Sequence, residues 1–335
     1  MRYTLFGTTG LRVSQLALGT GNFGTHWGHG ADPETSKAVF EAYADAGGNF
    51  VDTADVYQFG QSEEFLGGLL AGRREHFVLA SKFTNGATSG ANRLVTGNSR
   101  KAMVASLEAS LKRLRTDRLD IYWVHHPDGV TPTDEIVRGF EDLARAGKIL
   151  YAGLSNFSAW RLARAVTLAQ LTNAVPIAAA QFEHSLVHRE PEADLFPASR
   201  ALGVGVVTWS PLGGGMLTGK YRNGEKGRAE GFGGRVFQPE NSEQRTRILD
   251  TVLALAAELD VSADQIAIAW AGAHGAVPLI GPRSLSQLTS NLGALSLELS
   301  AEHLNRLSEV SSLSSEPSKQ LTAWAVDDGA SRVVA

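Results

Sequence analysis

The amino-acid sequence predicts a (β/α)8 barrel, the α/β fold also called a TIM barrel, with an N-terminal β-hairpin and extra C-terminal helices. Short apolar runs lack the two-residue alternation of half-exposed strands, which indicates strands buried on both faces. These runs alternate with amphipathic segments through eight units, as expected for parallel strands joined by helices. No change in composition marks a second domain, so residues 1–335 are expected to form a single unit.

The first elements of the chain predict the closure of one end of the barrel. Short strands at 3–5 and 11–13 flank Gly7 to Gly10, a pattern typical of a hairpin, which could close the bottom of the barrel. The barrel strands that follow are predicted at 15–19, 50–52, 77–82, 119–125, 148–153, 176–181, 205–209 and 276–280.

The helices between these strands are predicted from capping residues and from apolar residues at three- and four-residue spacing. Asp32 is the expected N-cap of the first helix, and Ser62 is the expected cap of the second. A long irregular segment at 213–240 interrupts the alternation. The helices are expected at 33–46, 62–70, 99–114, 133–146, 158–171, 190–202, 242–259, 262–274, 284–292 and 301–307.

Composition excludes several classes of protein. The formal net charge is −4, so nothing attracts the chain as a whole to nucleic acid or to an anionic membrane. Cysteine is absent, which excludes disulfides, thiolate metal sites and cysteine nucleophiles. The N-terminus lacks the apolar core of a signal peptide, and no apolar run is long enough for a membrane span. A cytoplasmic protein is therefore expected.

Two glycine-rich stretches partly match nucleotide-binding motifs. Gly19 to Gly24 fits a dinucleotide fingerprint, but residues 25–30 separate it from the next helix, which favours a loop at the barrel mouth. Gly214 to Lys220 is one residue short of a P-loop, and Tyr221 replaces the hydroxyl residue that would bind Mg²⁺. Glycine amides beside a lysine can still hold a phosphate, and on local grounds this remains open beside a plain turn.

Three neighbouring strands end in residues that carry chemistry. Strand two ends at Asp52, strand three at Lys82 and strand four at His125, and Tyr57 follows strand two by five residues. Catalytic groups of a (β/α)8 barrel lie at the carboxyl ends of its strands, so these four side chains are expected to meet there. Each alone has an ordinary explanation, as a turn former, a surface lysine or a core histidine. Their coincidence on adjacent strands indicates a site.

A metal site is the alternative interpretation of the histidines. His125 and His126 are adjacent, and adjacent residues of a strand point to opposite faces, so they are not expected to share an ion. His26 and His29 lie in a glycine-rich loop, and no paired-histidine zinc motif is present. We therefore expect no metal.

The four side chains suit proton donation to an oxygen that gains negative charge. Lys82, held by Asp52, would favour the ionised form of the neighbouring phenol and so make Tyr57 a stronger acid. His125 would help to orient the reacting oxygen. Since no protein nucleophile is needed, carbonyl reduction is the reaction suggested, with the hydride supplied by a cofactor.

The chain resembles the aldo-keto reductase superfamily, and more its bacterial and potassium-channel-β-like branch than the aldose-reductase branch. The matching motifs are DTADVY (52–57), SK (81–82), DIYWVH (120–125), GLSN (153–156), WSPL (209–212), LTGKY (217–221) and GPR (281–283), followed by Gln287 and Asn291. The resemblance implies a barrel that binds NADPH and reduces aldehydes or ketones. It places the catalytic tetrad on Asp52, Tyr57, Lys82 and His125, with Tyr57 as the general acid.

The resemblance also implies the cofactor site. Gly19, Thr20 and Asp52 would lie near the nicotinamide, Ser155, Asn156 and Gln181 would bind its carboxamide, and Trp209 would stack on its ring. Ser210, Leu212, Gly214 and Lys220 would hold the pyrophosphate, and Arg283, Gln287 and Asn291 the adenosine end. The family often has a lysine and a later arginine where this chain has Gly281 and Gln287. NADPH remains favoured through Arg283, and use of NADH is also possible.

The substrate is expected to be a small carbonyl compound or alcohol, and the oligomeric state is left open. Phe23, Trp27, Tyr57, His125 and His126 are the predicted substrate-binding residues. Met216 and Trp324 are further candidates for the walls of the pocket, and the loop 83–98 is a candidate for its rim. Two other functions are considered: a cofactor-binding regulatory subunit like the channel β-subunits, and a non-redox barrel enzyme. Neither nucleic acid nor a membrane is an expected partner.

Overall fold

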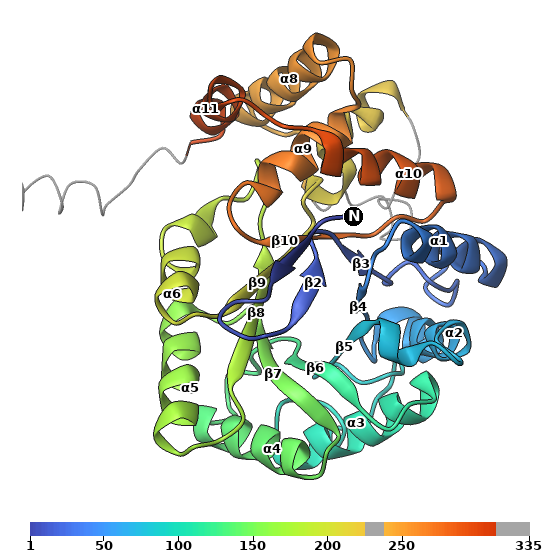
Figure 1. Ribbon diagram of the computed structural model, residues 1–335, viewed down its shortest axis with the longest axis vertical. Helices are drawn as coiled ribbons and strands as arrows, with labels where there is room; N and C mark the ends of the chain where they lie inside the picture. The colour runs from blue at the N-terminus through green and yellow to red at the C-terminus, as the bar shows by residue number, and fades with distance from the viewer. Residues whose placement is uncertain (225–237, 313–335) are drawn as a thin grey trace, which may run out of the picture.

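A computed structural model describes residues 1–224 and 238–312, and within them eight parallel strands form a closed barrel (Figure 1). Neighbours around the ring follow the order β10-β3-β4-β5-β6-β7-β8-β9, so the last strand closes against the first. The barrel strands are β3 (Ala17–Gly19), β4 (Phe50–Asp52), β5 (Val78–Phe83), β6 (Leu119–Val124), β7 (Ile149–Ser155), β8 (Ile177–Glu183), β9 (Gly205–Trp209) and β10 (Val277–Ile280).

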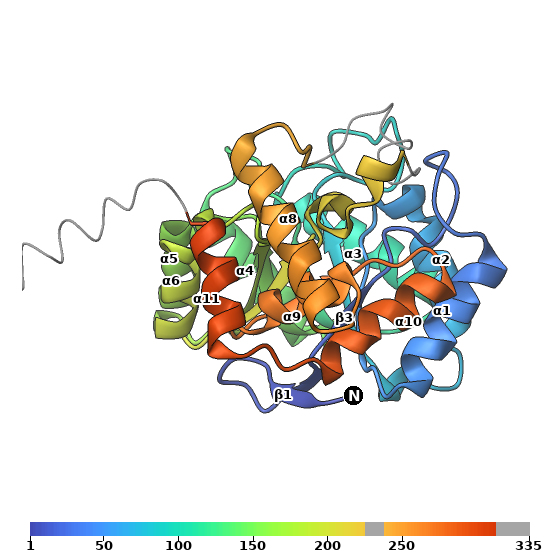
Figure 2. The same ribbon diagram turned by 90° about the horizontal axis from the view of Figure 1, so that it is seen from above.

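Helices surround this ring. Two of them, α8 and α11, lie farther from the strands, and α8 packs against both α9 and α11 (Figures 1 and 2). The α-helices are α1 (Pro33–Asp45), α2 (Gln61–Leu69), α3 (Arg100–Leu114), α4 (Thr133–Arg145), α5 (Ala159–Leu171), α6 (Leu195–Ala201), α8 (Glu243–Glu258), α9 (Ala263–Gly272), α10 (Leu285–Gly293) and α11 (Ala301–Val310). The short 3-10 helices are η1 (Tyr57–Gly60), η2 (Arg74–His76), η3 (Glu190–Glu192), η4 (Gly213–Thr218), η5 (Lys220–Asn223) and η6 (Ala294–Ser296).

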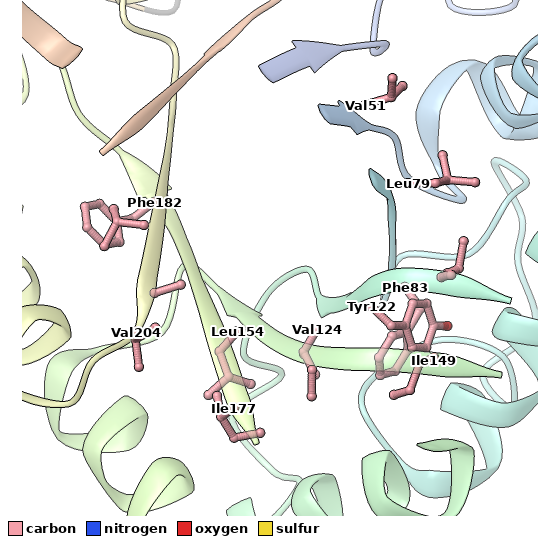
Figure 3. Packing of buried hydrophobic residues seen from close by; sticks show 14 of the residues in the cluster. Val51, Leu79, Phe83, Tyr122, Val124, Ile149, Leu154, Ile177, Phe182 and Val204 are labelled. Carbon is pink, nitrogen blue, oxygen red and sulfur yellow. The ribbon is translucent and has the colours of Figure 1, made fainter. Parts of the chain in front are cut away.

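Alternation along each strand divides the side chains between two cores. On β5, Leu79 and Phe83 belong to the large cluster between strands and helices, whereas Val78 and Ala80 belong to the cluster inside the barrel. Figure 3 shows the outer cluster, with Phe83 stacked on Tyr122 of β6 at a centroid distance of 5.1 Å. The same alternation turns Lys82 inward at the carboxyl end of its strand, because it lies two residues beyond Ala80.

The N-terminal hairpin closes the opposite end of the barrel, as predicted. Its strands β1 (Tyr3–Leu5) and β2 (Arg12–Ser14) pair antiparallel, and Phe6 in the turn is buried within the inner cluster. The ring of Phe6 makes an edge contact with Phe50 at a centroid distance of 5.6 Å. The interior is therefore packed at this end, and the functional groups are confined to the other end.

Two predicted helical features are wrong. The helix expected at 190–202 is divided into η3 and α6, because Pro197 has no N–H for the Ala193 carbonyl and its ring would clash there. Ser62 is not an N-cap, since α2 begins at Gln61 after Gly60. The Ser62 hydroxyl instead donates to the carbonyl oxygen of Thr20 at 2.8 Å and so ties α2 to the first barrel loop.

Candidate active site

The centre of the candidate site is a buried ion pair between Lys82 and Asp52 inside the barrel. Both side chains are fully buried. The Lys82 ammonium donates to Asp52 Oδ1, to the Thr53 carbonyl oxygen at 2.8 Å and to the Tyr57 hydroxyl at 3.1 Å. Gln181 Nε2 donates to Asp52 Oδ2 at 3.1 Å. The adjacent strands β4 and β5 bring Asp52 and Lys82 together, because both side chains point inward near the carboxyl ends of their strands.

The charges of this pair are set by burial and by mutual attraction. Burial raises the pKa of Asp52, and the charge and hydrogen bond of Lys82 oppose that rise. Burial alone would lower the pKa of Lys82, but Asp52 and Tyr57 outweigh it, so the pKa of Lys82 is raised. Lys82 is therefore an ammonium at neutral pH, and Asp52 is its counter-charge.

Tyr57 lies in a constrained turn directly after β4. Gln58, Phe59 and Gly60 all have positive φ angles, of 50°, 53° and 91°, which reverse the chain within a short distance. The Gln58 side chain donates to the Gly21 carbonyl at 3.1 Å and accepts from the Trp27 amide at 2.8 Å. This amide therefore holds the turn against the first barrel loop, a role that the sequence does not reveal because nothing in it marks Gln58 as buried.

His125 lies beside Tyr57, with ring centroids 5.9 Å apart in an edge-to-face arrangement. Burial, followed by the charges of Lys82 and His126, lowers the pKa of His125 well below its ordinary value, so its ring is neutral at neutral pH. The expectation that His125 and His126 point apart is wrong: their rings stack at 4.3 Å with an angle of 11°. The alternation fails here because β6 ends at Val124, so both histidines follow the strand.

The residues expected near a nicotinamide form one hydrogen-bonded group. Asn156 has a positive φ of 62°, and its side-chain nitrogen donates to the His125 carbonyl at 2.9 Å and to Ser155 Oγ at 3.0 Å. Its side-chain oxygen accepts from Trp209 Nε1 at 3.0 Å, which holds the indole in place. Gln181 adjoins this group, since its carbonyl accepts from the Asn156 amide at 2.8 Å. The carboxyl ends of β7, β8 and β9 thus present polar groups beside one flat aromatic ring.

The glycine-rich stretch after β9 fits a phosphate. Gly213, Gly214 and Gly215 have positive φ angles of 55°, 66° and 96°, and Ser210 has one of 55°. A Cβ atom added to Gly215 would lie 2.9 Å from Lys220 Nζ, so the ammonium lies directly over this turn. Main-chain amides of a tight glycine turn together with a cation form an anion-binding donor set. Leu212, between these residues, packs against the cores on both sides.

The residues assigned to the adenosine end lie around the start of α10. Arg283 precedes Ser284, the N-cap of this helix, and the Arg283 amide donates to Gln287 Oε1 at 3.0 Å. The Asn291 amide is buried and donates to Asp264 Oδ2 of α9 at 2.7 Å, so it also holds α10 to α9. At the nicotinamide end, Thr20 is fully buried and its amide donates to the Asp52 carbonyl, which places the loop after Gly19 beside the ion pair.

The predicted substrate residues occupy two different environments. Trp27 makes an edge contact with Tyr57 at a centroid distance of 6.1 Å, so it is a neighbour of the Tyr57 ring. His126 is half-buried, and burial lowers the pKa of its ring. Phe23 and Met216, in contrast, are completely buried in packed clusters and present little surface to a ligand. Trp324 lies outside the described residues.

Among the described residues, His184, Glu192 and His274 form a cluster of residue types that bind metals. His184 Nε2 lies 2.8 Å and His274 Nε2 lies 3.7 Å from Glu192 Oε1. The Glu192 carboxylate already accepts from Arg189 Nε at 2.8 Å and from its terminal nitrogen at 2.6 Å. A cation in this position would compete with the guanidinium, so the cluster is an ion-pair network.

The fold and this site together define a barrel oxidoreductase, with charged and polar groups gathered at the carboxyl ends of the strands. The chain belongs to the aldo/keto reductase family, whose sequence model matches residues 15–312. It is accordingly an NAD(P)H-dependent oxidoreductase. Within the two described ranges, none of the helices combines the length and the apolar character that crossing a membrane requires.

Individual relatives span bacteria, fungi and plants. The chain is 36% identical to an uncharacterized oxidoreductase of Bacillus subtilis, over 92% of this chain and 96% of the relative. It is 32% identical to a putative aryl-alcohol dehydrogenase of Saccharomyces cerevisiae, over 90% of this chain and 84% of the relative. It is also 34% identical to a probable voltage-gated potassium channel subunit beta of Oryza sativa, over 88% of this chain and 91% of the relative.

Proposed function

We propose that this chain catalyses the NADPH-dependent, reversible reduction of aldehydes or ketones to alcohols, with Tyr57 as the proton donor. The observation that carries this proposal is the contact of 3.1 Å between Lys82 Nζ and the Tyr57 hydroxyl oxygen. Lys82 donates in this bond, so the Tyr57 oxygen accepts and its own O–H is left to donate to a substrate oxygen. An ammonium held at this distance stabilises the phenolate that remains after the proton has left.

His125 has a positioning role in the proposed reaction. Its ring is neutral, since burial lowers its pKa, and it lies edge-to-face against the Tyr57 ring. A neutral imidazole N–H directed at the substrate oxygen can orient the carbonyl without adding a charge near Lys82. When bound, the nicotinamide supplies the hydride, and the proton comes from Tyr57.

The cofactor proposal rests on three groups of residues. Ser155, Asn156 and Gln181 would hold the carboxamide while Trp209 stacks on the ring, and the glycine turn with Lys220 would hold the pyrophosphate. Arg283 would bind the 2′-phosphate of NADPH, because a guanidinium can make two parallel bonds to a phosphate. NADH is proposed as a weaker alternative, since Gly281 and Gln287 add no further positive charge at this end.

The surroundings of Tyr57 favour an apolar carbonyl substrate. Trp27 lies against the Tyr57 ring, and Phe59 lies against Trp27 at a centroid distance of 6.3 Å. Flat aromatic surface beside the proton donor suits an aromatic aldehyde, and the similarity to a putative aryl-alcohol dehydrogenase agrees with this chemistry.

Tyr57→Phe tests the assignment of the acid. The ring and its packing remain while the hydroxyl is lost, so kcat for an aromatic aldehyde should fall by about 10²–10⁴-fold. The dissociation constant for NADPH, measured by quenching of protein fluorescence, should stay within about twofold. Turnover is followed by the loss of reduced-nicotinamide absorbance.

Tyr3→Phe is the matched control, because the Tyr3 hydroxyl bonds to the Gly47 carbonyl, far from the barrel mouth. Near-normal turnover in Tyr57→Phe would refute the mechanism. Tight NADPH binding by the native chain without turnover of any aldehyde or ketone would instead favour a cofactor-binding regulatory subunit. The similarity to a probable potassium channel subunit beta is the observation behind that second function.

A further inference from the structure

Asp55 is a buried carboxyl group that the proposed mechanism does not use. It lies between Asp52 and Tyr57 in the chain, and only 1% of its surface is exposed. Its main-chain amide donates to the Lys82 carbonyl at 3.0 Å, which fastens the turn to β5. In the part of the chain that the structure describes, neither carboxyl oxygen makes a hydrogen bond of good geometry. A buried carboxylate without donors is costly, so the ionised form is disfavoured there.

The charged and titratable groups around Asp55 come from four elements, α2, α3, β5 and β6. Glu63 of α2 is completely buried and accepts from Ser81 Oγ at 2.6 Å and from Arg113 Nε of α3 at 2.7 Å. Tyr122 of β6 faces the same cluster, and burial raises its pKa well above the ordinary value, so it is neutral. On β5, Lys82 offers Asp55 its main-chain carbonyl, while its ammonium is engaged inside the barrel with Asp52.

Of the two carboxyl groups in this cluster, Glu63 is paired with a cation within the described ranges and Asp55 is not. Among the residues that the structure describes, Arg113 is the guanidinium beside the two carboxyl groups, and it is bound to Glu63. If Asp55 also ionised, two neighbouring anions would share one cation in a buried space. Burial, followed by the charge of Glu63, raises the pKa of Asp55 to about 7, while Arg113 and the amides of Val56 and Gly86 oppose this rise.

We propose that Asp55 is a positioning residue: as a neutral carboxylic acid it allows the turn 53–60 to pack against β5, α2 and α3, and its ionisation loosens this turn and displaces Tyr57 from Lys82. The turn can respond in this way because one of its hydrogen bonds to β5, from the Asp55 amide to the Lys82 carbonyl, runs through the main chain of Asp55 itself. The catalytic part of the proposal rests on the proposed function, and the stability part does not.

The expected pH dependence follows from the direction of the shift. The pKa of Asp55 is raised from its ordinary value of 3.8 to about 7, so the folded state favours the protonated form. The resulting loss of stability begins as the pH rises above 3.8 and is complete above about 7. Within the folded population, the ionised form of Asp55 becomes dominant only above about pH 7, and kcat should decline there.

Asp55→Asn tests the proposal, because asparagine has nearly the same shape and is neutral at every pH. The alkaline decline of kcat should move upward by about one pH unit or more, while KM and the dissociation constant for NADPH stay within about twofold. The melting temperature of the variant, relative to that of the native chain, should rise as the pH increases from 3.8 to about 7 and should stay constant above that. Glu64→Gln, at an exposed position on α2, is the control. It should leave the pH profiles of kcat and of the melting temperature unchanged.

Glu63→Gln is a second variant with the opposite expectation. It removes the anion that raises the pKa of Asp55, so the decline of kcat should move to lower pH. Superimposable profiles of kcat and of melting temperature for the native chain and Asp55→Asn would overturn the proposal. If no carbonyl compound is reduced at all, the proposed function fails. The pH profiles of the melting temperature then still test whether Asp55 is protonated in the folded chain.

Discussion

Lys82 shows how a single residue connects stability and chemistry in this protein. Its ammonium is fully buried and contacts a carboxylate, a main-chain carbonyl and the Tyr57 hydroxyl. Such a cation is tolerated in a barrel interior only because these three acceptors surround it. The same arrangement that stabilises the charge directs it at the phenol.

Removing the Lys82 charge should therefore affect both properties. Lys82→Met keeps the apolar stem but leaves Asp52 buried without its cation, so the free energy of unfolding should fall by about 3–5 kcal/mol. Urea unfolding followed by circular dichroism measures this loss, with Lys112→Met on the exposed face of α3 as the control. The double variant Asp52→Asn/Lys82→Met should recover part of the loss, and an equal or larger loss would contradict the account of Asp52 as the counter-charge.

The candidate site could be predicted from the sequence where its residues end strands. Asp52, Lys82 and His125 each follow an apolar run, so the fold class alone places them at one end of the barrel. Gln58 and Asp55 could not be assigned in this way, because their burial depends on how the turn packs against other loops. The stacking of His125 on His126 was also beyond prediction, since it depends on where β6 ends.

At the scale of elements, Gly153 shows how the packing inside the barrel depends on glycine. Gly153 on β7 faces the ring of Trp123 on the neighbouring strand β6, and a Cβ atom there would lie 2.6 Å from Trp123 Cζ3, well inside contact distance. Trp123 is completely buried and fills the interior near the ion pair. A large residue on one strand thus requires a residue without a side chain on the next.

Gly153→Ala should accordingly destabilise the protein by about 1–3 kcal/mol through overpacking. Its melting temperature is the measurement, and Gly68→Ala on α2, where an added Cβ meets nothing within 4 Å, is the control. The combination of Gly153→Ala with Trp123→Phe should be less harmful than the sum of the two single changes. Strict additivity would indicate that the glycine is needed for another reason.

Element boundaries were predictable where caps and glycines mark them and failed where tertiary contacts decide. Asp32 caps α1 as expected, with its carboxylate accepting from the Thr35 amide at 2.7 Å. Ser62 has the chemistry of a cap but serves a tertiary contact with Thr20. Pro197 was a visible signal that the helix at 190–202 would break, because an interior proline removes a main-chain donor.

At the scale of the molecule, the Arg189–Glu192 network joins distant parts of the chain. Besides binding Glu192, whose carboxylate also bonds to His184, the Arg189 guanidinium donates to the Ser308 carbonyl at 2.7 Å and to Ser311 Oγ at 3.0 Å. It thereby links η3, which follows β8, to the end of α11. Trp270 of α9 lies beneath the same guanidinium at 5.4 Å from the ring centroid.

The network should make the protein sensitive to acid. Burial tends to raise the pKa of Glu192, but its bonds to His184 and Arg189 lower it from 4.5 to about 2. Its contribution to stability is therefore present above pH 4.5 and is lost as the pH falls toward about 2. Partial exposure of the carboxylate limits this contribution to about 1–2 kcal/mol.

Comparing the native chain with Glu192→Gln by urea unfolding checks this expectation. The variant should have a lower free energy of unfolding at pH 7. This difference should shrink as the pH falls below 4.5, because the stabilisation by the ionised Glu192 carboxylate is lost toward pH 2. Glu243→Gln at the exposed start of α8 is the control. A difference that does not change with pH would show that the carboxylate acts through shape and not through charge.

The whole architecture was predictable because a count of eight strand–helix units leaves a closed ring as the natural arrangement. The pairing of β10 with both β3 and β9 confirms this closure. The network around Arg189 was not predictable, because its members lie far apart in sequence and show no shared motif. Long-range ion pairs of this kind depend on the relative placement of helices, which local patterns do not encode.

The hairpin that closes the bottom of the barrel also affects the side from which solvent and salt can screen the buried ion pair. Phe6, Phe50 and Trp123 fill the interior on that side, so in the described part of the molecule solvent and salt screen the pair mainly from the mouth. When an ion pair lies in a low-dielectric interior that is open at one end, its electric field extends out through that end. The small hairpin, at the opposite end of the barrel from Tyr57, thus gives the field of Lys82 and Asp52 a direction.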